Sequence, residues 1–425
     1  MFLYKVYARL FQAIFKLVSP FLPWRQPELL EGPGCLQELP ALLQRRQVSR
    51  LLVVSDQGIV KLGLMEPFLE GLRGKSIFYT VFDGTVPNPT IGNIETALNQ
   101  YNEHGCQAIV AFGGGSSMDC AKGIGARVAR PNLPVSRMKG LFKVGKRLPL
   151  LVAVPTTAGT GSEATLAAVI SNPATHEKYP INDPVLIPHL AVLDPELTLQ
   201  LPRQITSTTG MDALTHAVEA YIGHSNTKET EAAAIEATRL IMDNLVSVYQ
   251  QGNDVLRRGL LLKAAYLAGL AFTRAYVGYV HALAHTLGGF YSVPHGLANS
   301  VILPHVLEYF GPSAERRLAK LARAAGAVEP GLNDQAAAQA FIARIKVMNQ
   351  TMDIPEVINS IKPADIPLMV QRALAEANPL YPVPRILGRA DLTELLNIVS
   401  GQPGTRASAS AGLVQGEAHQ AEDGQ

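Results

Sequence analysis

Residues 108–128 read AIVAFGGGSSMDCAKGIGARV, and this stretch decides the fold class. The apolar run 108–112 has the length of a buried strand, and the glycines 113–115 interrupt it. A helical pattern follows over 117–128. Glycines let the backbone approach a pyrophosphate closely, and a helix N-terminus offers free N–H groups to an anion. The spacing is not G-x-G-x-x-G, so the turn is either a phosphate-binding loop or a plain tight turn.

The same alternation of strand and helix continues on both sides of this stretch. Short apolar runs occur at 51–54, 77–82, 150–154 and 190–193, and helical stretches such as 91–104 separate several of them. Strands alternating with helices predict a parallel, doubly wound sheet. We therefore expect residues 26–202 to form a Rossmann-like α/β dinucleotide-binding domain. In such sheets, ligands bind beyond the carboxyl ends of the strands.

Two more polar motifs follow predicted strands. Asp56 comes after the strand 51–54, where a carboxylate can bind ribose hydroxyls and would repel a 2′-phosphate. A carboxylate at this position could equally cap a helix. The loop 155–163, PTTAGTGSE, follows the strand 150–154. Its hydroxyls and glycines suit contacts with phosphate, ribose or nicotinamide, although surface loops share this composition.

Beyond residue 203 the strand pattern disappears. We expect a helical domain over 203–399 and a disordered, chemically silent tail over 400–425, which is rich in Gly, Ser, Ala and Gln. The predicted fold class is thus α/β followed by all-α. The helical patterns cover residues 205–224, 229–251, 255–276, 279–289, 297–310, 314–325, 334–350 and 364–377.

The helical half contains an unusual group of histidines. Asp212 and His216 are four residues apart, so they project from one face of a helix. His281 and His285 repeat this spacing, and His295 follows ten residues later. Fe²⁺ and Zn²⁺ both accept imidazole and carboxylate ligands. Asp212, His216, His281 and His295 would supply four ligands and leave one or two positions for water or a substrate oxygen.

Local signals suggest where these helices begin and end. Thr208, Thr209 and Gly210 are plausible start signals before Asp212. The glycines 288–289 should end the second helix, and Pro294 should turn the chain so that His295 opens the next element. The cofactor motifs lie on one predicted domain and the metal ligands on the other, so we expect the active site in the cleft between them.

Composition limits the possible partners and the compartment. The 425 residues are 47% hydrophobic and 17% charged, with a net charge of +2. This balance gives no signature of nucleic-acid binding. The three cysteines are odd in number and widely spaced, which fits a reducing cytosol and predicts a cytoplasmic protein without a disulfide framework.

Residues 1–25 form a predicted amphipathic helix with one narrow polar stripe, Lys5, Arg9, Gln12 and Lys16. The three cations argue against a transmembrane span, and no cleavage site follows as in a signal peptide. Two interpretations remain open. Residues 2–24 could lie peripherally on the inner face of the membrane, anchored by Trp24. They could instead pack on the enzyme body or a second subunit.

Six motifs together resemble the iron-dependent (group III) alcohol dehydrogenases, in that family's order and over roughly residues 28–395. The resemblance implies a dinucleotide-binding domain, a helical domain, commonly a homodimer, and NAD(P)-dependent interconversion of alcohols and aldehydes. The motifs are VPNPT (86–90), GGGSSMDCAK (113–122), VPTTAGTGSE (154–163), KYPINDPVLIPHLAVLDPEL (178–197), GMDALTHAVEAY (210–221) and HALAHTLGGFYSVPHG (281–296).

The resemblance also implies roles for single residues. Asp212, His216, His281 and His295 match the metal ligands, and His285 matches a histidine beside the metal. Asp56 matches the acidic position that accompanies NAD rather than NADP. The remaining expected cofactor-binding residues are Asn88, Gly114, Gly115, Ser116, Asp119, Thr156, Thr157, Thr160, Thr165 and Lys178.

Two features depart from the family pattern. Thr286 stands where many members have proline, which could relax the backbone at His285. Residues 1–25 exceed the usual family start, so the resemblance says nothing about them.

The expected reaction is hydride transfer between a primary alcohol or aldehyde and NAD, with Fe²⁺ or Zn²⁺ at the substrate oxygen. His285 would either relay the alcohol proton or only orient a ligand. The alternatives are a zinc-dependent polyol dehydrogenase of the glycerol or diol type, a related lyase, a metal hydrolase without dinucleotide, and a membrane-associated scaffold. Contact of residues 2–24 with a bilayer would favour a long-chain aliphatic substrate.

Overall fold

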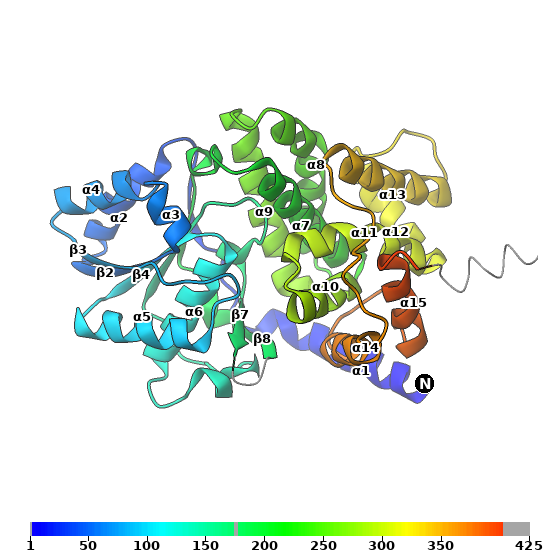
Figure 1. The fold of residues 1–425 in the computed structure, drawn as a ribbon, viewed down its shortest axis with the longest axis horizontal. Helices are drawn as coiled ribbons and strands as arrows, with labels where there is room; N and C mark the ends of the chain where they lie inside the picture. Colours follow the sequence, from blue (N-terminus) through cyan, green and yellow to red (C-terminus); the bar gives the residue numbers. More distant parts are fainter. Residues whose placement is uncertain (1, 174–176, 403–425) are drawn as a thin grey trace, which may run out of the picture.

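A computed structural model describes residues 2–173 and 177–402 (Figure 1). Its N-terminal α/β domain is built on a six-stranded parallel sheet in the order β1-β9-β6-β4-β2-β3. All five predicted strands are present. The sheet consists of β1 (Glu28–Glu31), β2 (Arg50–Val54), β3 (Phe78–Phe82), β4 (Ala108–Gly113), β6 (Leu150–Pro155) and β9 (Leu190–Leu193).

The sheet is covered by helices on both faces, as the doubly wound prediction requires (Figure 1). Alternate strand residues point to opposite layers: Leu52 packs with α5 (Ile91–Glu103) and α6 (Gly115–Ala129). Its neighbours in β2 pack with α2 (Leu39–Arg45) and α4 (Glu66–Gly74). Burial on both faces explains why these strands are continuous apolar runs.

The sequence analysis missed β1 and a second, three-stranded sheet. Strand β1 lies at the edge of the main sheet and is mostly exposed, so it lacks an apolar run. The second sheet has the order β5-β8-β7, with β5 (Gly140–Leu141), β7 (Ala167–Asn172) and β8 (Glu177–Asn182). Figure 1 shows β7 and β8 between α6 and the helical domain, which is where this sheet contributes Lys178 to the site.

The C-terminal half is entirely helical in the residues that the structure describes. All eight predicted helices are present, and one further helix, α15, follows them. The helices are α7 (Arg203–Ile222), α8 (Lys228–Gln250), α9 (Val255–Ala275), α10 (Tyr279–Tyr291), α11 (His295–Phe310), α12 (Pro312–Ala324), α13 (Asp334–Thr351), α14 (Ile366–Ala377) and α15 (Arg389–Val399).

Two expected helix boundaries are wrong. Helix α7 begins at Arg203, directly after Pro202, and the hydroxyls of Thr208 and Thr209 bond to carbonyls one turn earlier inside the helix. Helix α10 continues through the glycines 288–289 to Tyr291. The expectation that His295 opens the next helix is confirmed. The predicted disordered tail lies outside the described residues from 403 onward.

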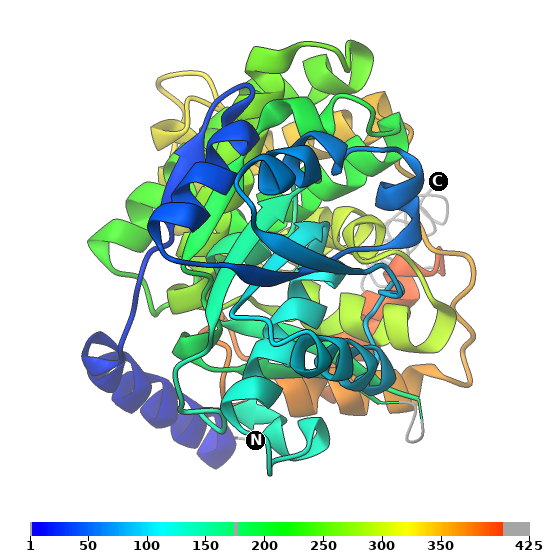
Figure 2. The same ribbon diagram turned by 90° about the vertical axis from the view of Figure 1, so that its left-hand side faces the viewer.

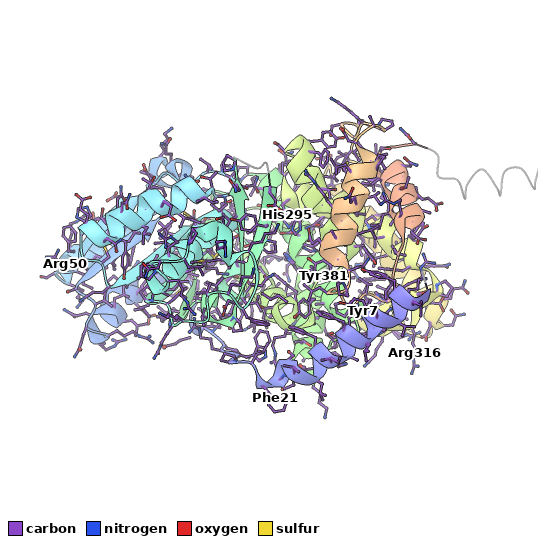
Figure 3. The ribbon with its side chains drawn as sticks, turned by 90° about the horizontal axis from the view of Figure 1, so that it is seen from below. Tyr7, Phe21, Arg50, His295, Arg316 and Tyr381 are labelled. Carbon is purple, nitrogen blue, oxygen red and sulfur yellow. The ribbon has the colours of Figure 1, made fainter. Side chains whose placement is uncertain are left out.

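Helix α1 (Phe2–Val18) lies against the helical domain (Figure 3), and residues of its polar stripe bind backbone carbonyls there. Arg9 donates to the Pro384 carbonyl at 3.0 Å, and the Gln12 amide donates to the Tyr381 carbonyl at 2.8 Å. Among the described residues, no single helix is long and apolar enough to span a membrane. Helices α9 and α10 reach that length only as a pair bent by 104°.

Candidate active site

The four predicted metal ligands converge from three helices. Asp212 and His216 come from α7, His281 from α10 and His295 from the first residue of α11. Their ligand atoms all lie within 4.8 Å of one another. Asp212 Oδ1 is 3.6 Å from His295 Nε2 and 3.9 Å from His281 Nε2. The cluster therefore has the size of one metal site.

Close backbone packing makes this convergence possible. Gly296, next to His295, lies so near α7 that a Cβ atom there would be 2.5 Å from the Thr208 carbonyl oxygen. Only glycine permits this approach of α11 to α7. The ring of His216 stacks on Phe272 of α9 with 4.2 Å between centroids, which fixes its orientation.

Two residues outside the predicted set orient the ligands. Glu219, one turn after His216, accepts a hydrogen bond from His281 Nδ1 at 2.6 Å and from the Val280 N–H at 2.8 Å. Its burial raises its pKa to about 8. Asn299 of α11 donates its amide to Asp212 Oδ1 at 2.6 Å. Such partners select the tautomer of a ligating histidine and hold the carboxylate in place.

The electrostatics of the cluster favour neutral imidazoles. Burial, with smaller contributions from the neighbouring histidines, lowers the pKa of His281 well below its ordinary value. Burial also lowers the pKa of His216 and of His295. His281 Nε2 is buried and has no hydrogen-bond partner. Three neutral imidazoles and one carboxylate form a donor set that fits Fe²⁺ or Zn²⁺.

His285 lies beside the cluster and belongs to a separate hydrogen-bond network. Its ring stacks on His295 with 5.2 Å between centroids. Its Nδ1 is 2.7 Å from the Glu376 carboxylate of α14, and the Tyr381 hydroxyl donates to the same carboxylate at 2.8 Å. Burial raises the pKa of Tyr381 well above its ordinary value, so the phenol stays protonated.

The three sequence motifs of the α/β domain meet at the carboxyl ends of neighbouring strands. Strands β2, β4 and β6 are adjacent, and Gly113 pairs in register with Pro155. Gly113 has φ +153°, and a Cβ atom there would lie 2.5 Å from Ser117 Oγ. Asp56 Oδ1 accepts from the Ile59 N–H at 3.1 Å, so this carboxylate does cap a short helix, α3 (Gln57–Lys61).

The glycine turn packs against the threonine-rich loop after β6. A Cβ atom on Gly115 would be 2.8 Å from Thr160 Cγ2, and one on Gly114 would contact Thr157 at 3.5 Å. The Thr156 N–H donates to the Gly113 carbonyl at 3.0 Å. The two loops therefore form one surface at the N-terminus of α6, where free N–H groups favour an anion.

Some expected cofactor residues are themselves paired. Lys178 donates to Asn88 Oδ1 at 2.6 Å, which closes the far side of the glycine turn. Asp119 is half-buried and accepts from Ser162 Oγ at 2.9 Å. Burial raises the pKa of Asp119. Thr165 Oγ1 accepts from the buried Lys122 ammonium at 3.0 Å. Asp119 and Thr165 therefore support the loops that face the cavity.

One cavity of about 750 Å³ joins the two halves of the site. Asp56, Gly114, Thr156 and Thr157 do not line it. The predicted site residues that do line it are Asn88, Gly115, Ser116, Asp119, Thr160, Thr165, Lys178, Asp212, His216, His281, His285 and His295.

Four residues that contact the site were not predicted, and only some of them could have been found from the sequence. Glu219 follows Asp212 by seven residues and Asn299 follows His295 by four, so helical spacing already places each on the ligand face. Glu376 and Tyr381 come from a distant segment without a motif. Only the packing of α14 against α10 brings them to His285.

The fold and the site together define a class: a Rossmann-like α/β domain joined to a helical domain in which three histidines and one aspartate form a cluster of the size of a metal site. Family models match both halves. The model described as iron-containing alcohol dehydrogenase covers residues 27–195, and the C-terminal model of the iron-containing alcohol dehydrogenases covers 206–399. The chain belongs to the iron-containing alcohol dehydrogenase family and is an alcohol oxidoreductase.

Similar proteins extend over most of the chain. Alcohol dehydrogenase 4 of Schizosaccharomyces pombe is 38% identical over 83% of this chain and 84% of its own length. NAD-dependent methanol dehydrogenase of Bacillus methanolicus is 34% identical over 84% of this chain and 93% of its own length. A crystal structure of 1,3-propanediol oxidoreductase superposes with a TM-score of 0.85 at 36% identity, covering 88% of this chain and 99% of that one.

Proposed function

We propose that this protein is an NAD-dependent dehydrogenase that interconverts primary alcohols and aldehydes, with Fe²⁺ held by Asp212, His216, His281 and His295. One observation carries the proposal: the same cavity is lined by this ligand cluster and by the glycine turn and threonine loop of the α/β domain. A substrate in that cavity would lie between a metal and a dinucleotide.

The metal and the dinucleotide would provide the chemical reactivity, and the protein would position the substrate and transfer the proton. When bound, the metal supplies Lewis-acid polarisation of the substrate oxygen, and the nicotinamide accepts or returns the hydride. Glu219 keeps a proton on His281 Nδ1, so that Nε2 presents its lone pair to the cluster. Asn299 holds Asp212 at the centre of the cluster through its amide.

The glycine turn and the threonine loop would hold NAD. The free N–H groups at the start of α6 suit a pyrophosphate, and Gly115 leaves room for its close approach. We assign ribose recognition to Asp56, whose carboxylate would repel the 2′-phosphate of NADP. The Lys178–Asn88 pair would close the nicotinamide side of the cavity.

His285 is our candidate for the proton relay. With its Nδ1 proton donated to Glu376, its Nε2 lone pair can accept the proton of a substrate hydroxyl. The Glu376 carboxylate would then stabilise the imidazolium, and the proton could pass on to water. In the reverse direction the imidazolium returns the proton to the forming alcohol.

Several finer assignments belong to the same proposal. We propose the domain limits 26–202 and 203–399, a homodimer, and a cytoplasmic location. A second substrate class is supported by the 36% identity to 1,3-propanediol oxidoreductase, which favours a diol. The same ligands would accept zinc in such an enzyme.

The test is NADH formation by anaerobically purified protein with added Fe²⁺, added Zn²⁺ or chelator, across primary alcohols and diols. We expect iron-dependent NAD reduction that is lost, together with bound metal, in His295→Ala. His305→Ala, on the same helix and away from the cavity, serves as the matched control and should retain both. Bound metal and bound NAD without turnover of any alcohol or diol would refute the proposed reaction.

A further inference from the structure

Helix α1 presents an apolar surface to solvent. Its polar residues Arg9 and Gln12 are bound to backbone carbonyls of the helical domain, so the opposite side of the helix faces outward. Figure 3 labels Tyr7 on α1 and Phe21 just beyond the C-terminal end of the helix, and both side chains are exposed. The outward-facing large apolar residues are Leu3, Tyr4, Val6, Tyr7, Leu10, Ile14, Leu17, Val18 and Phe21.

The residues of this surface recur at helical spacing along one side of α1 and are unusually exposed. Leu3 is 81% exposed, Leu17 74% and Phe21 85%. Single exposed apolar residues are common, but a row of them along one helix marks a surface that binds something apolar. In Figure 2, α1 lies at the margin of the molecule, apart from the main sheet, so the row is accessible.

Positive charge lies beside the row. Of the four cations in residues 1–25, three (Arg9, Lys16 and Arg25) donate to backbone carbonyls, so the exposed charge comes mainly from a neighbouring loop. Phe15 stacks on Phe142 with 6.2 Å between centroids, which places the loop 142–147 beside the helix. That loop exposes Lys143, Lys146 and Arg147, and none of the three pairs with a carboxylate of the described residues.

The inner side of α1 packs on the wall of the active-site cavity. The Phe15 ring lies 5.7 Å from the Tyr276 ring, and both Tyr276 and Phe142 line the cavity. Leu22 and Trp24, just after α1, line it as well. The inner side of α1 and the segment after it therefore contact the same cavity that the histidine cluster lines.

We propose that α1 docks with its apolar row in the interfacial layer of an anionic lipid bilayer, and that the enzyme takes long-chain aliphatic alcohols or aldehydes dissolved in that lipid. The inference rests on the proposed function of the site. A lipid surface satisfies both features: acyl chains accept the apolar row, and anionic headgroups accept the adjacent cations.

Other partners would match the exposed surface of α1 less well than a lipid bilayer. A second copy paired through α1 would bring two sets of unpaired cations together, which costs free energy. A membrane span is excluded by length and contacts, because 17 residues of helix reach only about 26 Å and the polar stripe is bound to the protein.

The first test is flotation of the full-length protein with phosphatidylglycerol vesicles and with phosphatidylcholine vesicles. We expect flotation with the anionic vesicles and at least about tenfold less in Leu10→Glu/Leu17→Glu, which removes apolar area while leaving the inward stripe intact. Leu256→Glu/Val347→Glu replaces two exposed apolar residues on other helices, α9 and α13, and is the matched control. Lys143→Glu/Lys146→Glu should weaken binding to the anionic vesicles.

Two results would overturn the inference. Equal recovery of wild type in the soluble fraction with both vesicle types would exclude the lipid surface. A second outcome combines two observations: the wild type does not float with either vesicle type, and its dimer dissociates in Leu10→Glu/Leu17→Glu when measured by analytical ultracentrifugation. That outcome would assign the apolar row to contact with a second copy of the chain.

A kinetic measurement separates this inference from the proposed function. Leu10→Glu/Leu17→Glu should oxidise a short, water-soluble alcohol at the wild-type rate, since α1 touches no reacting atom. The same variant should lose about tenfold in rate on a long-chain alcohol supplied in anionic vesicles. Unchanged rates on both substrates would refute the docking role, whereas no turnover of either by wild type would refute the proposed reaction instead.

Discussion

Replacement of Glu219 by glutamine should weaken metal binding without changing any ligand. In the native protein the carboxylate accepts from His281 Nδ1 at 2.6 Å and from the Val280 N–H at 2.8 Å. Glutamine can keep only one of these bonds, because its NH₂ group donates. If its oxygen stays on Val280, the NH₂ group faces the Nδ1 proton of His281. The imidazole must then change tautomer or rotate, and Nε2 no longer presents its lone pair to the cluster.

The size of the effect follows from the lost contact. Leaving a buried donor without its hydrogen-bond partner costs about 1–3 kcal/mol. Removal of such a partner of a metal ligand typically lowers metal affinity about 10–100-fold, which corresponds to roughly 1.4–2.7 kcal/mol. The two estimates agree, so we expect Glu219→Gln to fold, to bind metal about 10–100-fold more weakly, and to lose turnover in proportion at limiting metal.

The assay is competition for Fe²⁺ or Zn²⁺ between the protein and a chelator of known affinity, followed by measurement of bound metal. Glu103→Gln, an exposed carboxylate on α5, controls for the loss of one negative charge. Glu376→Gln is a second comparison, because its partner His285 is not among the four ligands. Native metal affinity in Glu219→Gln would refute the orienting role.

Three further predictions concern the relay, the cofactor turn and the pH dependence of stability. His285→Ala should keep its metal but lose about 10²–10⁴-fold in kcat; loss of metal from this variant would contradict the relay assignment. Gly113→Ala should weaken NAD binding in a fluorescence titration, because the new Cβ would meet Ser117 Oγ at 2.5 Å and φ +153° disfavours alanine. Burial, helped by the Arg25 guanidinium, lowers the pKa of His189 to about 4. This folded-state pKa lies below the unfolded-state value near 6.5. The contribution of neutral His189 to the free energy of unfolding is therefore fully present above pH 6.5 and is lost as the pH falls toward 4. Melting curves recorded across this pH range should show that the free energy of unfolding of the wild type falls by about 1–2 kcal/mol, after allowance for partial exposure of the ring. The free energy of unfolding of His189→Asn should fall less. An identical pH dependence in the two proteins would contradict this assignment.

The sequence predicted the elements whose local pattern reflects their burial. Strands such as β4 are buried on both faces, so they appear as uninterrupted apolar runs. β1 escaped prediction because it is an exposed edge strand. The start of α7 was misplaced because threonines can satisfy their hydroxyls inside a helix by bonding to carbonyls one turn back, as Thr208 does.

The sequence by itself determined the chemistry of the site. The four-residue spacing of Asp212 and His216 and the nearby histidine pair specify imidazole and carboxylate donors on helix faces, and helical spacing is a local property of the chain. The glycine turn after a strand likewise specifies a helix N-terminus open to an anion.

Only the tertiary structure decided which of these groups meet. Glu376 reaches His285 across 91 positions of sequence because α14 packs on α10. The sequence pattern also did not decide which side of α1 packs on the protein, since a narrow polar stripe can face water or protein. Backbone carbonyls of residues 379–384 accept hydrogen bonds from Arg9 and Gln12, so the apolar row of α1 faces solvent. Local spacing specifies which face of a helix carries a group, but the neighbour of that face depends on how distant segments pack.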